Sequence, residues 1–374
     1  MAKQHEKVVL VFQGGGALGA YQAGAYEALH EAGIRPDWLA GISIGAINSA
    51  IIVGSPEDKR VENLRRFWET VSSGLQGNLG ANEDYLRKIS NEMAAMTGAI
   101  MGVPGFFTPR ASKPLSLFLD PMARISLYDT APLKKTLNEL IDFDLINAGK
   151  TRLSLGAVDV ISGNFAYFDN LDIALKAEHV AASGALPPGF APVEIDGNYY
   201  WDGGLVSNTP LQAVLYDRKM DSDLCIYQVD LFSARGRMPR DLFDVESREK
   251  EIRYSSRTRL NTDQFREMQK VRMAAKRLTE KLPPDMKDDP DAKLLARIGN
   301  DSAVTLVHLI QRQAAYDTHS KDYEFSRRSV EEHWKTGYDD VMETLQNPAF
   351  INRKRPENGI QIFDLAEQRL KRRF

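Results

Sequence analysis

Residues 8–45 decide the fold, and they read VVLVFQGGGALGAYQAGAYEALHEAGIRPDWLAGISIG. The apolar run at 8–12 predicts a short buried strand, because it is rich in β-branched and other hydrophobic side chains. Apolar residues at helical spacing predict a helix over 20–31. Residues 38–42 predict a second strand, which leads at once into a helix over 45–52. Two strands alternating with two helices in about 45 residues predict a parallel sheet covered by helices.

The rest of the chain continues this alternation and ends in a segment of different character. Further strands are expected at 153–158, 165–168, 199–201, 224–230 and 304–310. Further helices are expected at 63–71, 82–96, 173–182, 248–281 and 329–345. We therefore predict an α/β fold, a three-layer α/β/α sandwich with a mainly parallel sheet. Residues 1–232 are expected to form its main domain. Residues 233–374 are expected to form a mostly helical C-terminal extension, whose strand at 304–310 is a candidate to complete the same sheet.

The composition excludes several classes of protein. The chain has 374 residues, of which 43% are hydrophobic and 26% charged, as in ordinary soluble globular proteins. A net charge of −3 argues against a dedicated nucleic-acid binder. A single cysteine, Cys225, excludes an internal disulfide and a cysteine-rich zinc site. The charge-free stretches are interrupted by glycines and polar residues, and the first apolar run is too short for a signal peptide. A cytoplasmic location is expected.

A glycine-rich loop follows the first strand. Gly14, Gly16 and Gly19 form G-x-G-x-x-G between a strand and a helix, where backbone N–H groups are able to approach an anion. A dinucleotide-binding fold would also need an acidic residue at the end of the second strand. Asp37 lies before that strand, which disfavours a dinucleotide cofactor. Taken alone, the loop is explained by default as a tight turn packed under a helix.

A second motif favours catalysis. Gly41, Ser43 and Gly45 form G-x-S-x-G at the second strand-to-helix junction, the position of a nucleophile elbow. Such a turn lifts the serine oxygen to a helix N-terminus, and small neighbours make room for it. A serine of this kind needs a base. The histidines of the predicted fold, among them His179 and His308, lie in places more typical of structural residues.

A carboxylate is the better candidate for the base. Asp202 ends a short aromatic strand and is followed by Gly203 and Gly204, which permit a tight turn. The three motifs in this order resemble the signature of the patatin-like phospholipases. The stretches FQGGGALGAYQAG, AGISIGAIN, ASGALPPGFAPV and YWDGGLVSNTPL add to the likeness, which covers roughly residues 7–212.

The resemblance implies an α/β/α fold and a catalytic dyad of Ser43 and Asp202 without histidine. It also implies an oxyanion hole made by backbone amides of Gly14, Gly15 and Gly16, with Ile44 next to the nucleophile as a further donor. Gly19, Gly41, Gly45, Gly203 and Gly204 support these motifs. One position departs from the family, since many members carry Arg or Lys where this chain has Leu18.

We expect a serine lipid acyl hydrolase of phospholipase A or lysophospholipase type, with a lipid or other acyl ester as its substrate. It would work through an acyl-enzyme and need no cofactor or metal. Two alternatives stay open. One is an esterase or thioesterase for short-chain or polyester substrates, and the other is a surface-bound scaffold with vestigial activity. Oligomerisation also stays open, and no nucleic-acid partner is expected.

Two further segments suggest contact with lipid. The loose apolar stretch 93–107, with Met96, Met101, Phe106 and Phe107, fits a lid or acyl-chain wall as well as it fits ordinary core. Residues 248–281 carry +6 (11 − 5) and residues 353–374 carry +4 (7 − 3). This asymmetry predicts that the extension meets an anionic membrane or lipid surface, with a solvated helix face or an oligomer contact as the alternative.

Overall fold

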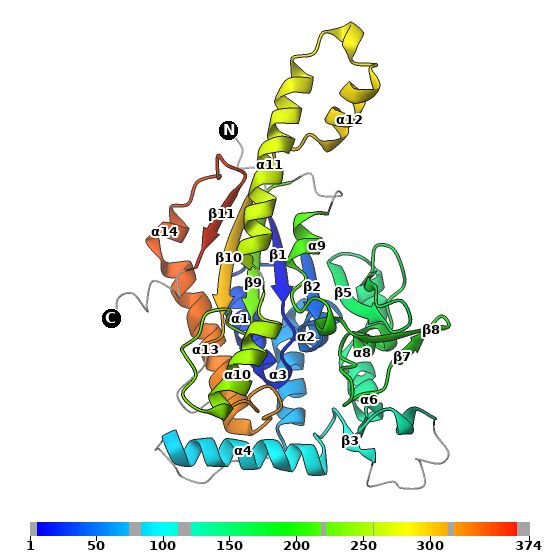
Figure 1. The fold of residues 1–374 in the computed structure, drawn as a ribbon, viewed down its shortest axis with the longest axis vertical. Helices are drawn as coiled ribbons and strands as arrows, with labels where there is room; N and C mark the ends of the chain where they lie inside the picture. Colours follow the sequence, from blue (N-terminus) through cyan, green and yellow to red (C-terminus); the bar gives the residue numbers. More distant parts are fainter. Residues whose placement is uncertain are drawn as a thin grey trace.

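The computed structural model describes residues 6–74, 84–110, 121–217, 222–256, 258–312 and 318–364. Within these residues nine strands form one sheet (Figure 1). Six are parallel, in the order β11 (Ile360–Phe363), β10 (Val304–Ile310), β9 (Leu224–Asp230), β1 (Lys7–Phe12), β2 (Trp38–Ile42) and β5 (Arg152–Asp159). Beyond them lie the antiparallel strands β8 (Asn198–Asp202) and β7 (Val193–Ile195), and β6 (Phe165–Asp169) also pairs with β5.

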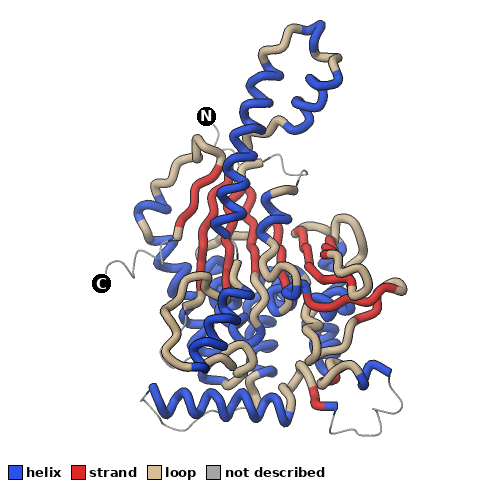
Figure 2. Tube along the Cα trace, in the orientation of Figure 1, coloured by secondary structure: helices blue, strands red, loops and turns tan. Residues whose placement is uncertain are grey.

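Helices cover both faces of the sheet, as the tube view also shows (Figure 2). Leu10 and Phe12 of β1 point into the larger core, whereas Val9 and Val11 point into the smaller one. The larger core is closed by α1 (Ala20–Glu31), α2 (Ile44–Val53), α3 (Arg60–Val71), α6 (Ala131–Leu140), α8 (Ala177–Ser183) and α13 (Arg327–Gln346). The smaller core is closed by α9 (Leu211–Leu215) and α11 (Thr258–Glu280). The predicted three-layer, mainly parallel fold is confirmed.

The extension contributes both strands and helices. Its strands β10 and β11 continue the sheet beyond β9. The single helix expected over 248–281 is wrong, because two helices, α10 (Leu242–Tyr254) and α11, stand there instead. The chain turns extended at Ser255, where ψ is 148°. Two short helices, α12 (Pro290–Ile298) and α14 (Pro348–Ile351), complete this part.

The sheet register brings three loops together. β1 and β2 are parallel neighbours, so the glycine-rich loop and Ser43 leave the same edge, which we call the carboxyl edge. On β5, Gly156 pairs with Ile42 of β2, and the next residue, Ala157, pairs with Asp202 of β8. The ends of β2 and β8 therefore lie on either side of the same point of β5.

Two other elements lie at this edge. The helix α4 (Asp84–Met101) crosses below the sheet in Figure 1, near a small hairpin of β3 (Thr108–Pro109) and β4 (Tyr128–Asp129). None of the helices in the described part of the chain combines the length and hydrophobicity needed to cross a membrane.

Candidate active site

Ser43 occupies a sharp turn between β2 and α2. Its φ is 55° and its ψ is −122°, a conformation that costs an L-residue roughly 1–3 kcal/mol. The turn needs glycine on both sides. A Cβ on Gly41 would lie 2.4 Å from the carbonyl oxygen of Gly45, and one on Gly45 would lie 2.4 Å from that of Phe12. The G-x-S-x-G spacing is thus explained by close backbone approach, and it leaves the serine at the N-terminus of α2.

A second serine holds this turn in place. The Ser43 N–H donates to Ser183 Oγ at 3.0 Å, and the Ser183 hydroxyl donates to the Gly156 carbonyl at 2.6 Å. Ser183 is fully buried at the end of α8. No motif in the sequence marks this residue. It lies in the stretch ASGALPPGFAPV, but a lone serine at a helix end gives no signal of its own.

Asp202 is buried beside Ser43. Its Oδ1 accepts the Gly204 N–H at 2.7 Å. Burial raises the pKa of Asp202 to about 6, although the neighbouring Ser43 side chain and the Gly204 N–H act in the opposite direction. A carboxylate with such a pKa is ionised near neutral pH yet basic enough to accept a proton, as a general base requires.

The glycine-rich loop lies against the same serine. A Cβ on Gly14 would come 3.1 Å from Ser43 Cβ. The Gly14 N–H donates to the Asn208 carbonyl at 3.1 Å, and Asn208 Nδ2 donates back to the Gly14 carbonyl at 3.0 Å. Asn208 therefore clamps the loop. It lies in the stretch YWDGGLVSNTPL, yet nothing in the sequence marks it as a partner of Gly14. Leu18, the position that departs from the family, is buried in the core.

The extension also holds this loop. The Tyr254 carbonyl, at the end of α10, accepts Gln13 Nε2 at 3.0 Å and Asn208 Nδ2 at 2.9 Å. The Asp322 carbonyl accepts the Ala17 N–H at 2.7 Å. Gly16 has a φ of 54°, and a Cβ there would lie 2.0 Å from the Asp322 carbonyl oxygen. This glycine is therefore needed both for its backbone conformation and for the contact with the extension.

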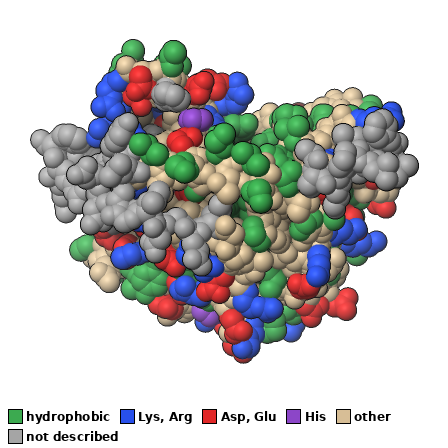
Figure 3. Space-filling view, turned by 90° about the horizontal axis from the view of Figure 1, so that it is seen from below, with side chains coloured by type: hydrophobic (Ala, Val, Ile, Leu, Met, Phe, Trp, Pro, Cys, Tyr) green, Lys and Arg blue, Asp and Glu red, His purple; other side chains and the backbone are tan. Residues whose placement is uncertain are grey.

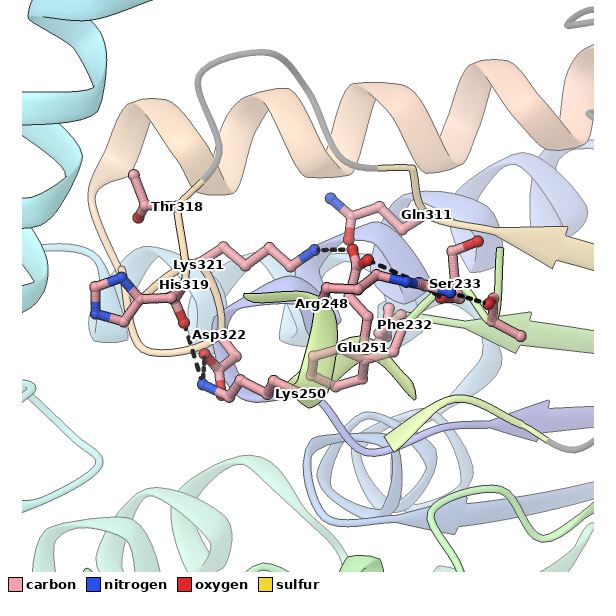
Figure 4. Close-up of polar contacts among 12 residues, drawn as sticks. Phe232, Ser233, Arg248, Lys250, Glu251, Gln311, Thr318, His319, Lys321 and Asp322 are labelled. Atoms are coloured by element: carbon pink, nitrogen blue, oxygen red, sulfur yellow. Dashed lines mark hydrogen bonds and ion pairs between the residues drawn. The ribbon is translucent and has the colours of Figure 1, made fainter. Parts of the chain in front are cut away.

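Ion pairs fix the two extension segments to each other (Figure 4). Lys250 Nζ lies 2.5 Å from Asp322 Oδ1 and donates to the His319 carbonyl at 3.2 Å. Lys321 Nζ lies 2.9 Å from Glu251 Oε1, and both side chains are buried. Through these pairs α10 and residues 319–322 act as one support for the glycine-rich loop.

The histidines considered as alternative bases make their contacts elsewhere. His179 Nδ1 accepts the Lys176 N–H at 2.9 Å, and His308 Nε2 lies 2.6 Å from Asp230 Oδ2. Burial lowers the pKa of His333 to about 4, and its ring is hydrogen-bonded to Gln311. Across the described ranges, no three His, Cys, Asp or Glu side chains gather as a metal site would require.

The segment 93–107 has two different parts. Phe106 and Phe107 are buried in an aromatic cluster with Tyr128 and Phe190, so they belong to the core. The methionines of α4, by contrast, are exposed. The interpretation as core holds for the phenylalanines, and the methionines require a separate explanation.

Two family models match the chain. One, described as patatin-like phospholipase, matches residues 10–215, and the other, described as patatin phospholipase, matches residues 252–357. Of the solved structures, VipD from Legionella pneumophila is similar at 17% identity and a TM-score of 0.37, with 98% of this chain and 73% of that chain covered. ExoU from Pseudomonas aeruginosa, solved with SpcU of the type III secretion system, is similar at 17% identity and a TM-score of 0.27, with 71% and 53% covered. These two likenesses are too loose to carry a functional conclusion, and no curated protein matches the chain.

Proposed function

The chain belongs to the patatin-like phospholipase family, and from this premise we propose that it is a serine acyl hydrolase acting on lipid esters through Ser43 and Asp202. The observation that carries the proposal is the pairing of a strained, helix-capping serine with a buried carboxylate whose pKa is raised to about 6. A serine with a purely structural role does not require a strained backbone, and an aspartate with a purely structural role does not require a buried carboxyl group. Together they supply a nucleophile and its base.

In the first half of the reaction, Ser43 Oγ forms a bond to the ester carbonyl carbon while Asp202 accepts the hydroxyl proton. The carbonyl oxygen becomes an oxyanion, which backbone N–H groups stabilise. The Gly14 N–H already donates to Asn208, so we assign this role to the amides of Gly15, Gly16 and Ile44. The intermediate collapses, the ester C–O bond breaks, and Asp202 returns the proton to the departing alcohol oxygen.

In the second half, water replaces the alcohol. Its oxygen attacks the carbonyl carbon of the acyl-Ser43 ester while Asp202 accepts one of its protons. When this intermediate collapses, the bond to Ser43 Oγ breaks and the serine regains the proton from Asp202. A carboxylic acid leaves, and the same base has served both halves without a cofactor.

The substrate class is tested by hydrolysis. The full-length protein and its Ser43→Ala variant are assayed on phosphatidylcholine vesicles and on p-nitrophenyl esters from acetate to palmitate. We expect the parent to release fatty acid from the vesicles and to prefer the longer esters. A preference for acetate and butyrate with no lipid hydrolysis would support the short-chain esterase instead. Equal turnover by parent and Ser43→Ala would refute the proposed enzyme and leave the scaffold.

A further inference from the structure

The helix α4 has its hydrophobic face turned outward. Its large side chains are exposed, at 42% for Ile89, 57% for Met93, 65% for Met96, 61% for Ile100 and 73% for Met101. The spacing of 89, 93, 96 and 100 places four of them on one stripe of the helix. On the opposite side, Ala95 and Gly98 are buried. An ordinary surface helix has the reverse arrangement, with its large apolar residues toward the protein.

The surroundings of this face are also apolar. The sequence carries no charged residue between Glu92 and Arg110. Ile125 and Leu127, which precede β4, are exposed as well. They lie near the end of α4, because the Tyr128 hydroxyl donates to the Ala99 carbonyl at 3.0 Å. We call the exposed side chains of Ile89, Met93, Met96, Ile100, Met101, Ile125 and Leu127 the α4 patch. Figure 3, which views the molecule from below, shows hydrophobic side chains gathered across the face where α4 lies.

Backbone hydrogen bonds connect the α4 patch to the candidate active site. Leu127 N–H donates to the Pro188 carbonyl at 3.1 Å, and Tyr128 N–H donates to the Gly189 carbonyl at 2.9 Å. A few residues earlier on that segment, the Ala185 carbonyl accepts the Asp202 N–H at 3.0 Å. The loop that borders the α4 patch therefore also holds the residue assigned as the base. Both lie at the carboxyl edge of the sheet.

The basic part of the extension is a weaker candidate for contact with lipid. Residues 266–298, which we call the finger, project at the end of the molecule opposite to α4 (Figure 1). Some of their basic side chains have acidic partners, with Lys270 on Glu267, Lys276 on Asp301 and Lys293 on Asp288. Local pairing reduces the positive field that an anionic surface would meet. Residues 365–374 of the second basic segment lie outside the described residues.

We propose that the α4 patch is a docking surface for lipid bilayers, through which the protein presents its active site to its substrate. The occupant is lipid because the patch is uncharged, rich in adaptable methionine, and continuous with a site whose proposed substrate is a lipid ester. The role of the α4 patch in bringing the active site to its substrate rests on the proposed function. The contact is apolar, so the protein binds neutral vesicles and binding resists salt.

The test uses flotation with phosphatidylcholine vesicles and the full-length Ser43→Ala protein, which leaves the lipid intact. The triple change Met93→Gln, Met96→Gln, Ile100→Gln removes apolar surface while introducing a residue of good helix propensity. The matched control changes Met268, Val271 and Leu278 of α11 to Gln, since these are exposed to a similar degree at 44%, 56% and 51%. We expect the α4 variant to bind at least about tenfold more weakly and the α11 variant to bind like the parent.

Several outcomes would overturn the docking proposal. They are equal binding by the α4 variant, loss of binding only in the α11 variant, or binding that requires anionic lipid and disappears in salt. A parent that is dimeric in size-exclusion chromatography, does not float, and becomes monomeric in the α4 variant would make the patch a self-association face. The proposed function fails separately, when the parent with Ser43 intact floats but hydrolyses no ester. If both proposals are correct, the α4 variant carrying Ser43 hydrolyses p-nitrophenyl butyrate at the parent's rate. It hydrolyses vesicle lipid at least about tenfold more slowly than the parent.

Discussion

The carboxyl edge of the sheet and the finger lie at opposite ends of the molecule and use their residues differently. At the carboxyl edge, Ser43 has a strained backbone, Asp202 is buried with its pKa raised to about 6, and α4 exposes its large hydrophobic side chains. In the finger, Lys276 pairs with Asp301, and its hydrogen bond lowers the pKa of that carboxyl.

Stability is sacrificed at the carboxyl edge of the sheet. Strain, an ionisable group in a buried place and uncovered apolar surface all raise the free energy of the folded state. The strained serine and the buried carboxyl both occur at the edge to which we assign chemistry, as expected when function and stability conflict. Exposed apolar side chains occur at both ends, since the finger exposes Met268, Val271 and Leu278. Substitutions at the carboxyl edge should therefore change activity, and matched substitutions elsewhere should not.

The largest contrast concerns the base. Asp202→Asn should lower kcat by about 10²–10⁴-fold, because the amide cannot accept the serine proton. As controls, His179→Asn and His308→Asn should keep most of the activity, since both rings bond elsewhere. Steady-state kinetics on p-nitrophenyl butyrate measure all three. A folded His308→Asn or His179→Asn protein as inactive as Asp202→Asn would replace the dyad with a triad.

A pair of glycines gives the next contrast. Gly16→Ala should lower kcat by about 10²–10³-fold, because its Cβ would collide with the Asp322 carbonyl and displace a proposed oxyanion donor. Gly33→Ala is the matched control, since Gly33 also has a positive φ, of 76°, but has nothing within 4 Å of its Cβ position. It should cost roughly 1–2 kcal/mol of stability and leave kcat unchanged. A Gly16→Ala defect confined to KM would argue against the oxyanion role.

The raised pKa of Asp202 predicts a pH profile. Below pH about 6 the carboxyl is protonated and cannot act as a base, so kcat/KM should fall about tenfold for each pH unit. The stabilising contribution of a raised carboxyl pKa is complete below the unfolded value, near 4, and is lost as pH rises through about 6. Asp202→Asn should therefore raise the free energy of unfolding at alkaline pH and not at acid pH. A flat rate profile down to pH about 4 would contradict the assignment.

Two lysines give the smallest contrast in rate. Lys321→Met leaves the buried Glu251 with Arg248 as its remaining ion-pair partner and should cost about 1–3 kcal/mol of stability. It should also lower kcat several-fold by loosening the support of the glycine-rich loop. Lys276→Met breaks an exposed pair of the finger and should cost less than about 1 kcal/mol without affecting kcat. Denaturant unfolding and kinetics on the same samples test both statements. Equal effects of the two changes would mean that the extension does not support the site.

The part of the fold that follows from local patterns was predictable. The first two strands and the helix between them stand where periodicity and glycines predict them, with bounds Lys7–Phe12, Ala20–Glu31 and Trp38–Ile42. The order of the three motifs also predicted which loops carry Ser43 and Asp202. Their meeting depends on the register across β5, which no local pattern contains.

Features set by distant contacts were not predictable. The helix breaks after Tyr254, within a stretch whose composition favours one long helix. The Tyr254 carbonyl accepts hydrogen bonds from the side chains of Gln13 and Asn208, which are distant in the sequence. The strand β11 has four residues and takes its place only by pairing with β10. The sequence predicted a helix over 82–96, but it could not tell which face of α4 meets the protein.

The assignment of Ser43 as the nucleophile is tested most directly by covalent labelling. A fluorophosphonate probe is incubated with the parent and with Ser43→Ala, and the modified peptide is identified by mass spectrometry. We expect a single adduct on Ser43 in the parent, faster labelling at pH above about 6 than below it, and no adduct in Ser43→Ala. An adduct on another serine that persists in a folded Ser43→Ala protein would contradict it.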